Sequence, residues 1–251
     1  PYDRLDRPAM FMSKNWMTHV WSWDHAFNAM ALSQHSPSLA WDQFTLPFDY
    51  QMASGRLPDA VDDADRYRNF TKPPIHGWAL DWMHRHTDAL DRAKLSTMYD
   101  PLSRWTEWWF DYRDHDDDGI PQYGHGNDSG ADNSTWFLQG PDVESPDLSA
   151  CLAVQMQMLS TIAADLDRES AAQRCDRRSN ALSDRLVEHS WDKAASEFRV
   201  LASGDHETVP DAGGLLPYRS IVAGEELPDE VTEDLAQDIE AGFLNDHGVA
   251  S

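Results

Sequence analysis

The sequence has little of what marks disulfide-rich, secreted or membrane proteins. Its two cysteines, Cys151 and Cys175, both fall in segments with helical periodicity, so we expect buried thiols and no disulfide framework. No run approaches the roughly 18 apolar residues of a membrane span, and no basic-then-apolar leader stands at the start. The chain begins with Pro1, so the missing leader says little about the compartment of the parent protein. We expect a cytoplasmic protein with no membrane partner.

Positive charge is also scarce. The chain has 20 basic residues against 44 acidic ones, for a formal charge of -24, and four of the basic residues are lysines. A field of this sign repels phosphate backbones and anionic lipids, so nucleic-acid and membrane partners are not expected. Aspartate outnumbers glutamate 33 to 11. Salt adaptation and simple codon usage both account for that excess, so no habitat follows from it.

What is present indicates a folded helical protein. Hydrophobic residues make up 41% of the chain, which is typical of globular proteins, and apolar residues recur at helical spacing. We expect Asp100 to be an N-cap with Pro101 in the first helical position. Helical pairs recur about every 40 residues, a period that fits an α/α toroid and an α-solenoid equally well. The expected helices cover residues 23–35, 38–53, 73–86, 100–114, 145–166, 169–189, 215–224 and 229–244.

A loop rich in aspartate follows the fourth of these helices. Asp114, Asp116, Asp118 and Gly119 form D-x-D-x-D-G, the first half of a calcium-binding loop, in which alternate carboxylates converge on one hard cation. The bidentate glutamate expected at the twelfth position is replaced by His125. A bound structural calcium and a solvated turn that caps helix ends are therefore both open.

The next segment, GNDSGADNS at 126–134, places two carboxylates four residues apart among small residues, which let the backbone approach a ligand closely. In isolation such a segment is typical of two Asx-turns in a surface connection. Ten of the eleven tryptophans lie at or before Trp136, and flat aromatic faces stack on sugar rings. Core packing explains many of these tryptophans, but not readily their concentration around polar loops, so the combination favours a sugar-binding site. The aromatic candidates are Trp21, Trp23, Trp78, Trp109, Tyr123 and Trp136.

Three segments carry a family resemblance: WSWDHAFNAMAL, KPPIHGWAL and DHDDDGIPQYGHGNDSGADNSTWF. Their identity and order resemble glycoside hydrolase family 63 and related trehalase-like enzymes. The resemblance implies an all-α (α/α)6 toroid and an inverting reaction on α-linked glucosides, or mannosides, of small oligosaccharides. It also implies that Asp132 is the general acid, a role in which burial beside aromatics would help the carboxyl stay protonated.

The same resemblance implies a set of substrate-binding residues. Asp24, beside Trp23, would hydrogen-bond the sugar in the reacting subsite, although a simple helix N-cap is an equal alternative for Asp24. Lys72 stands where trehalase-like enzymes often have Gln, which leaves the choice of substrate open. The substrate-binding residues expected in full are Trp23, Asp24, Lys72, Asp128, Gly130, Asn133 and Trp136.

The resemblance also indicates what the chain does not contain. An inverting enzyme needs a second carboxylate that activates water, and the family's base is a glutamate beyond residue 251. Glu144, Glu197, Glu207 and Glu225 lie in polar stretches and are not expected to replace it. Because seven or eight helices are expected and a complete toroid needs twelve, we interpret 1–251 as one catalytic domain truncated at its C-terminal end. No cofactor is required for this chemistry.

Two other functions compete with this interpretation. Another (α/α)6 enzyme, such as a sugar epimerase or isomerase, would use paired histidines as proton shuttles. Eleven histidines occur, but no two share a setting in the sequence that suggests a paired acid and base. The second alternative is a non-catalytic carbohydrate-binding fragment that keeps the aromatic cleft without a complete catalytic pair.

Overall fold

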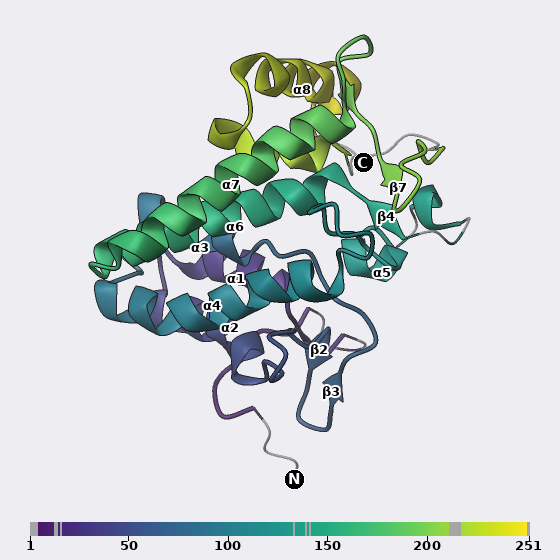
Figure 1. Cartoon of the computed structure of the whole chain (residues 1–251). Helices are drawn as coiled ribbons and strands as arrows, with labels where there is room; N and C mark the ends of the chain where they lie inside the picture. The colour runs from purple at the N-terminus through teal and green to yellow at the C-terminus, as the bar shows by residue number, and fades with distance from the viewer. Residues whose placement is uncertain are drawn as a thin grey trace. The chain divides into compact units, whose positions relative to one another are not determined.

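The computed structural model describes residues 5–12, 15, 17–132, 134–138, 140, 142–210 and 217–249. Within them the chain is mostly helical (Figure 1). The helices are α1 (Asp24–Leu32), α2 (Pro37–Asp49), α3 (His76–His86), α4 (Arg92–Tyr112), α5 (Gly126–Ser129), α6 (Pro146–Asp165), α7 (Glu169–Ser190) and α8 (Asp229–Gly242), with 3-10 helices η1 (Thr135–Phe137) and η2 (Pro217–Glu226). The strands are β1 (Val20–Trp21), β2 (Ala60–Val61), β3 (Arg66–Tyr67), β4 (Val143–Glu144), β5 (Trp191–Asp192), β6 (Glu197–Phe198), β7 (Leu201–Ala202), β8 (Leu244–Asn245) and β9 (Gly248–Val249).

The start of α4 corrects one prediction. The helix begins at Arg92 and runs through Pro101, so Asp100 is not an N-cap. A proline inside a helix forfeits one backbone hydrogen bond and crowds the preceding turn. The apolar face of α4 nevertheless continues across Pro101 at helical spacing, and its burial outweighs that local cost. The buried residues on this face are Leu95, Met98, Leu102 and Trp105.

The contacts of the chain divide it into two compact units. Unit 1 comprises Pro1–Trp108 and Gln155–Cys175, and unit 2 comprises Trp109–Val154 and Asp176–Ser251. Helices α4, α6 and α7 therefore contribute residues to both units. Each unit has its own short antiparallel pairings: β1–β2–β3 in unit 1 and, among others, β4–β7 in unit 2.

Helices α6 and α7 lie side by side (Figure 1). In unit 2, the Ser179 hydroxyl donates to the Ala153 carbonyl at 2.8 Å. In unit 1, the Ser160 hydroxyl donates to the Ala172 carbonyl at 2.9 Å. Both free cysteines lie on these helices, Cys151 buried and Cys175 partly exposed. No helix of the described residues combines the length and apolarity needed to cross a bilayer.

His76 lies at the centre of unit 1. Its ring contacts Phe48 and Trp105 edge-on, at centroid distances of 5.1 and 6.5 Å, and its Nε2 is 2.9 Å from the Ser22 carbonyl. The side chain is fully buried, and burial lowers its pKa from 6.5 to about 4. A charged imidazole is disfavoured in such surroundings, so His76 folds in its neutral form.

The low pKa of His76 predicts acid sensitivity. Between pH 6.5 and pH 4 the unfolded chain binds a proton that the folded chain excludes, so stability is lost as pH falls through this window. We expect the group to remove about 3 kcal/mol from the unfolding free energy between these limits. Denaturant unfolding of His76→Gln should show a shallower pH dependence than wild type. His84→Gln, at an exposed position on α3, should keep the wild-type slope, and an unchanged slope for His76→Gln would contradict the assignment.

Candidate active site

The segment predicted to carry the catalytic acid forms a short helix, α5, where two Asx-turns were the alternative. The His125 side chain caps it by accepting from the Asn127 backbone N–H at 3.0 Å. Gly130 ends it in the left-handed conformation, with φ of 67°, which glycine adopts without strain. The Ser129 hydroxyl donates to the Gly126 carbonyl at 2.7 Å and accepts from the Ala131 N–H at 3.1 Å. The turn that leads to Asp132 is therefore closed by its own side chains.

The buried carboxylate of Asp128 holds this turn through two contacts. It is 2% exposed and lies 3.3 Å from Nη2 of Arg113, and it accepts from the Gly124 N–H at 3.2 Å. A Cβ at Gly124 would collide with the Arg113 guanidinium, so the glycine makes this approach possible. Asp128 was predicted to bind substrate; its burial and its ion pair instead favour a role in fixing the loop.

Asp132 itself is exposed. It lies between Ala131, whose carbonyl accepts from the Ser134 N–H at 2.9 Å, and Asn133, which is outside the described residues. Arg219, from η2, donates to the Ser129 carbonyl at 2.9 Å. An accessible carboxyl at the end of a fixed turn is in a position to reach a ligand. Its role as an acid stays a prediction.

Two residues that were predicted to bind substrate, Trp23 and Asp24, lie at the start of α1 in unit 1. Trp23 occupies the N-cap position without a capping side-chain hydrogen bond, and Asp24 is the first helical residue. The N-cap interpretation of Asp24 is therefore wrong, although a carboxylate in the first turn is favoured by the helix dipole. Beside it, Trp23, Phe27 and Trp78 form a chain of edge-to-face ring contacts at 5.7 and 6.1 Å. Phe27 is 43% exposed, so this aromatic group offers a surface to a ligand.

Lys72, also in unit 1, contacts two residues from other segments of that unit. Its Nζ lies 3.8 Å from Asp59 Oδ1 and 5.6 Å from the centre of the Trp21 ring. The side chain is 8% exposed, and the charge of Asp59 compensates the burial of the ammonium group. Contact between Lys72 and a substrate stays a prediction.

The aromatic prediction was too broad. Trp109 and Tyr123 are both fully buried and pack edge-to-face at 5.9 Å, so they belong to the core of unit 2. Trp136 is 2% exposed and packs with Val143, Val200 and Val209. Core packing therefore explains Trp109 and Tyr123, which have no accessible surface to offer a sugar, whereas contact between Trp136 and a substrate stays a prediction.

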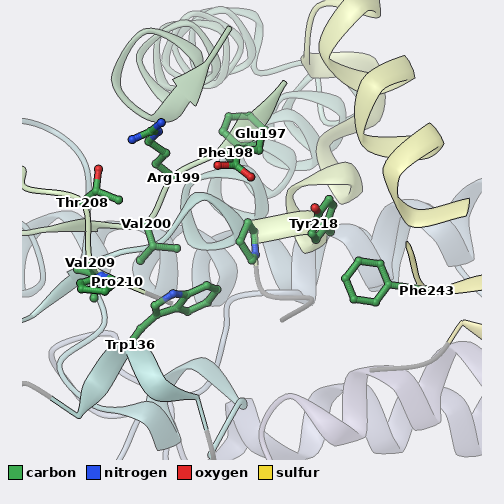
Figure 2. Close-up of a pocket in the computed structure, with 11 residues that line it drawn as sticks. Trp136, Glu197, Phe198, Arg199, Val200, Thr208, Val209, Pro210, Tyr218 and Phe243 are labelled. Carbon is green, nitrogen blue, oxygen red and sulfur yellow. The ribbon is translucent and has the colours of Figure 1, made fainter. Parts of the chain in front are cut away.

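A pocket of about 350 Å³ lies beside Trp136 in unit 2. Figure 2 shows the Trp136 ring near Val200, with Tyr218 and Phe243 also bordering the space. Asp132 is not among the described residues that line this pocket.

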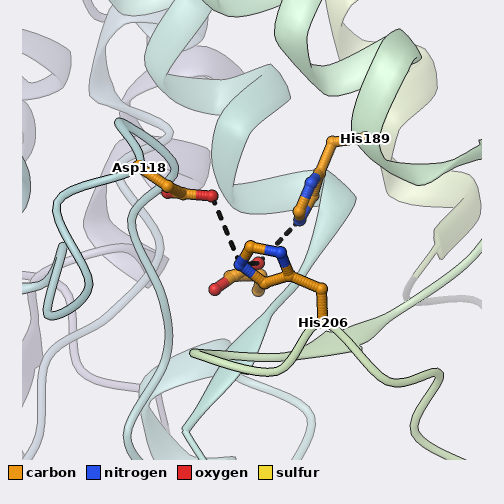
Figure 3. Close-up of side chains that lie close together, drawn as sticks. Asp118, His189 and His206 are labelled. Carbon is orange, nitrogen blue, oxygen red and sulfur yellow. Dashed lines mark hydrogen bonds and ion pairs between the residues drawn. The ribbon is translucent and has the colours of Figure 1, made fainter.

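Three residues that the sequence did not single out come together in unit 2. Glu144 was placed in a polar stretch, but it is 1% exposed on β4. Nε2 of His189 lies 2.7 Å from its Oε2. The rings of His189 and His206 are 4.6 Å apart (Figure 3), a proximity that the sequence analysis did not predict. No local sequence pattern could show that these residues meet, because Glu144 belongs to β4, His189 to α7 and His206 to the hairpin after β7.

The electrostatics of this group follow from burial and pairing. Burial raises the pKa of Glu144. The hydrogen bond with Glu144 raises the pKa of His189, since a carboxylate partner stabilises the imidazolium.

The aspartate loop adjoins this group. The Asp114 carboxylate accepts from the backbone N–H groups of Asp118 and Gly119, at 3.1 and 3.0 Å, and burial raises its pKa. Asp116 Oδ2 accepts from the Gly204 N–H at 2.8 Å. Carboxylate oxygens of Asp114, Asp116 and Asp118 lie within 4.8 Å of one another. Calcium at these three residues stays a prediction.

The curated proteins to which this chain is similar include two hydrolases. The glucosylglycerate hydrolase of Mycolicibacterium hassiacum is 29% identical over 147 residues, which are 46% of this chain and 33% of that protein. The mannosylglycerate hydrolase of Rubrobacter radiotolerans is 24% identical over 160 residues, which are 51% of this chain and 36% of that protein. The matched region thus spans about a third of the length of these relatives.

Solved structures show the same fold. A GH63 mannosylglycerate hydrolase of Thermus thermophilus in complex with glucose matches 92% of this chain and 72% of that chain, at 17% identity and a TM-score of 0.77. The same enzyme with Tris and D-glycerate gives 18% identity, the same coverage and a TM-score of 0.76. These likenesses confirm the predicted helical toroid fold class.

A family profile settles the relationship. The profile of the mannosylglycerate hydrolase MGH1-like glycoside hydrolase domain matches residues 17–251. This match includes the α1 start, the aspartate loop and the Asp132 turn together. The chain belongs to the mannosylglycerate hydrolase MGH1-like glycoside hydrolase family.

Proposed function

We propose that this chain is the acid-bearing part of an inverting hydrolase of α-glucosyl or α-mannosyl conjugates of a small hydroxy acid such as glycerate. The observation that carries the proposal is the exposed Asp132 at the end of a turn fixed by the buried Asp128–Arg113 pair. The substrate class is supported by the names of the two curated relatives. A sugar joined to glycerate thus replaces the small oligosaccharides that the sequence analysis expected as substrates.

In the proposed reaction, Asp132 donates its proton to the glycosidic oxygen as the bond between that oxygen and the anomeric carbon breaks. Water attacks the anomeric carbon from the opposite face and loses its proton to a second carboxylate. The products are the free sugar, with inverted configuration, and the hydroxy acid. We expect the second carboxylate outside residues 1–251.

Positioning is the second requirement, because a fixed acid avoids the entropic cost of finding the substrate. Gly130 and the Ser129 hydrogen bonds fix the backbone before Asp132. The Trp23–Phe27–Trp78 surface offers apolar ring faces, which suit the C–H face of a sugar. We propose that Trp23 and Asp24 bind the reacting sugar.

The test is hydrolysis by the complete gene product, followed by proton NMR. Incubation with α-glucosylglycerate and α-mannosylglycerate should release glycerate and give the β-anomer of the sugar first. Trehalose and maltose serve as comparison substrates and should react more slowly. An α-anomer formed first would exclude inversion, and epimerised sugar without glycerate would support the epimerase alternative. Saturable binding with no turnover would indicate a binding protein.

A further inference from the structure

Arg219, in η2, joins the Asp132 turn to a part of unit 2 that is distant in the chain. Its Nη1 donates to the Ser129 carbonyl at 2.9 Å and lies 3.9 Å from Asp147 Oδ2. Ser129 is the last residue of α5 and precedes Asp132 by three positions. One guanidinium nitrogen therefore faces both the turn and a buried carboxylate.

Asp147 gives Arg219 a fixed partner. It lies in the first turn of α6, where the helix dipole favours a carboxylate. Its side chain is 2% exposed and accepts from the hydroxyls of Ser145 and Tyr123, from the latter at 3.3 Å. Burial raises the pKa of Asp147, and the nearby charge of Arg219 counteracts that rise. The ion pair thus compensates a buried charge and ties Arg219 to the start of α6.

The contacts of α5 differ in what they can fix. The Ser129 hydroxyl accepts from the Ala131 N–H at 3.1 Å, a bond within the turn that sets its shape but not its position in unit 2. Arg113 contacts α5 from outside through Asp128. Arg219 contacts the end of α5 from outside through the Ser129 carbonyl, and this is the end that leads to the exposed carboxyl.

We propose that Arg219 is a positioning residue for Asp132, a role that rests on the function proposed above. By holding the Ser129 carbonyl near α6, the guanidinium fixes the direction from which the Asp132 carboxyl reaches the glycosidic oxygen. Arg219 acts through the turn and carries out no step of the reaction itself. A misplacement of about 1 Å can lower a rate by about 100-fold, so a loosened turn lowers kcat even though the acid is still present.

Hydrogen exchange of the complete protein tests this contact without relying on activity. In Arg219→Met the amides of residues 126–132 should exchange at least about 10-fold faster, because the turn opens more easily. Arg219→Lys should restore most of the protection, since its ammonium can donate to the carbonyl and pair with the carboxylate. Arg177→Met, which removes an exposed arginine of α7, should exchange like wild type. Unchanged exchange at 126–132 in Arg219→Met would overturn the proposal.

Asp147→Asn provides a second variant in case Arg219→Met does not fold. The amide keeps the shape of the carboxyl but loses the charge that faces Arg219. We expect faster exchange at residues 126–132, with a smaller increase than in Arg219→Met. In the combined variant the two effects should not add, because both changes break one connection. Strictly additive effects, or exchange in Asp147→Asn like that of wild type, would overturn the connection through Asp147.

Steady-state kinetics separate positioning from other roles of Arg219. On α-glucosylglycerate, Arg219→Met should lower kcat by about 10–100-fold with KM nearly unchanged, and Arg219→Lys should recover most of the loss. On α-glucosyl fluoride, whose leaving group needs no proton, Arg219→Met should turn over at close to the wild-type rate. A similar loss with the fluoride would indicate a purely structural residue, and a raised KM for α-glucosylglycerate alone would indicate a residue that binds glycerate. Either result would overturn the positioning role.

Asp132→Asn, measured in parallel, distinguishes failure of this inference from failure of the proposed function. Lowered kcat in Asp132→Asn together with wild-type kcat in Arg219→Met would overturn the role of Arg219 alone. Wild-type kcat in Asp132→Asn would overturn the proposed function, and the positioning role with it, because no acid would then follow the turn.

Discussion

Replacing Asp132 with asparagine is expected to lower kcat for α-glucosylglycerate by about 10²–10⁴-fold, the usual contribution of general acid–base catalysis. The amide keeps the shape of the carboxyl but cannot donate the proton. KM should stay nearly unchanged, because the substrate is still bound in the ground state. Steady-state kinetics of the complete protein measure both constants.

The matched control is Asp184→Asn. Asp184 is exposed on α7, so this variant makes the same charge change away from the turn and should keep wild-type kinetics. Unfolding curves should overlay for wild type and both variants. An undiminished kcat in Asp132→Asn would exclude Asp132 as the general acid. Loss of folding in place of turnover would show that Asp132 is structural.

The second large effect is expected at Arg113. Its replacement by methionine would leave the Asp128 carboxylate buried without its charged partner. Removing one partner of a buried ion pair costs about 3–5 kcal/mol. Because Arg113 is 19% exposed and Asp128 2%, solvent reduces the cost, and we expect about 2–4 kcal/mol. Denaturant unfolding measures this loss directly.

A double variant separates charge from packing at this pair. Arg113→Met with Asp128→Asn removes the unpaired charge and should recover part of the stability lost in Arg113→Met alone. The double variant should also recover part of the kcat lost in Arg113→Met, because the Arg113–Asp128 pair fixes the turn before Asp132. Strictly additive losses in the double variant would show that the two side chains act independently.

Local sequence patterns predicted the helices well, because apolar periodicity reports directly on which face is buried. The long helices α6 and α7 follow the expected boundaries within about a residue or two, a scatter common to helix ends. The error at Pro101 has a tertiary cause. Burial of the α4 face on both sides of the proline outweighs its local preference for a first turn.

The candidate site was predictable only where its residues are close in sequence. The α5–Asp132 turn and the Trp23–Asp24 pair could be recognised from contiguous motifs. Glu144, His189 and His206 meet through strand pairing and a helix end, so no spacing in the sequence shows them together. Burial was equally hidden: Trp109 and Tyr123 were candidates for stacking on a sugar but are fully buried in unit 2.

The role of Asp132 as the acid is tested most directly by the leaving group. Fluoride departs from α-glucosyl fluoride without needing a proton, whereas glycerate does need one. We expect Asp132→Asn to hydrolyse the fluoride at close to the wild-type kcat/KM while losing at least about 10²-fold in kcat/KM on α-glucosylglycerate. Equal losses on both substrates would contradict proton donation by Asp132.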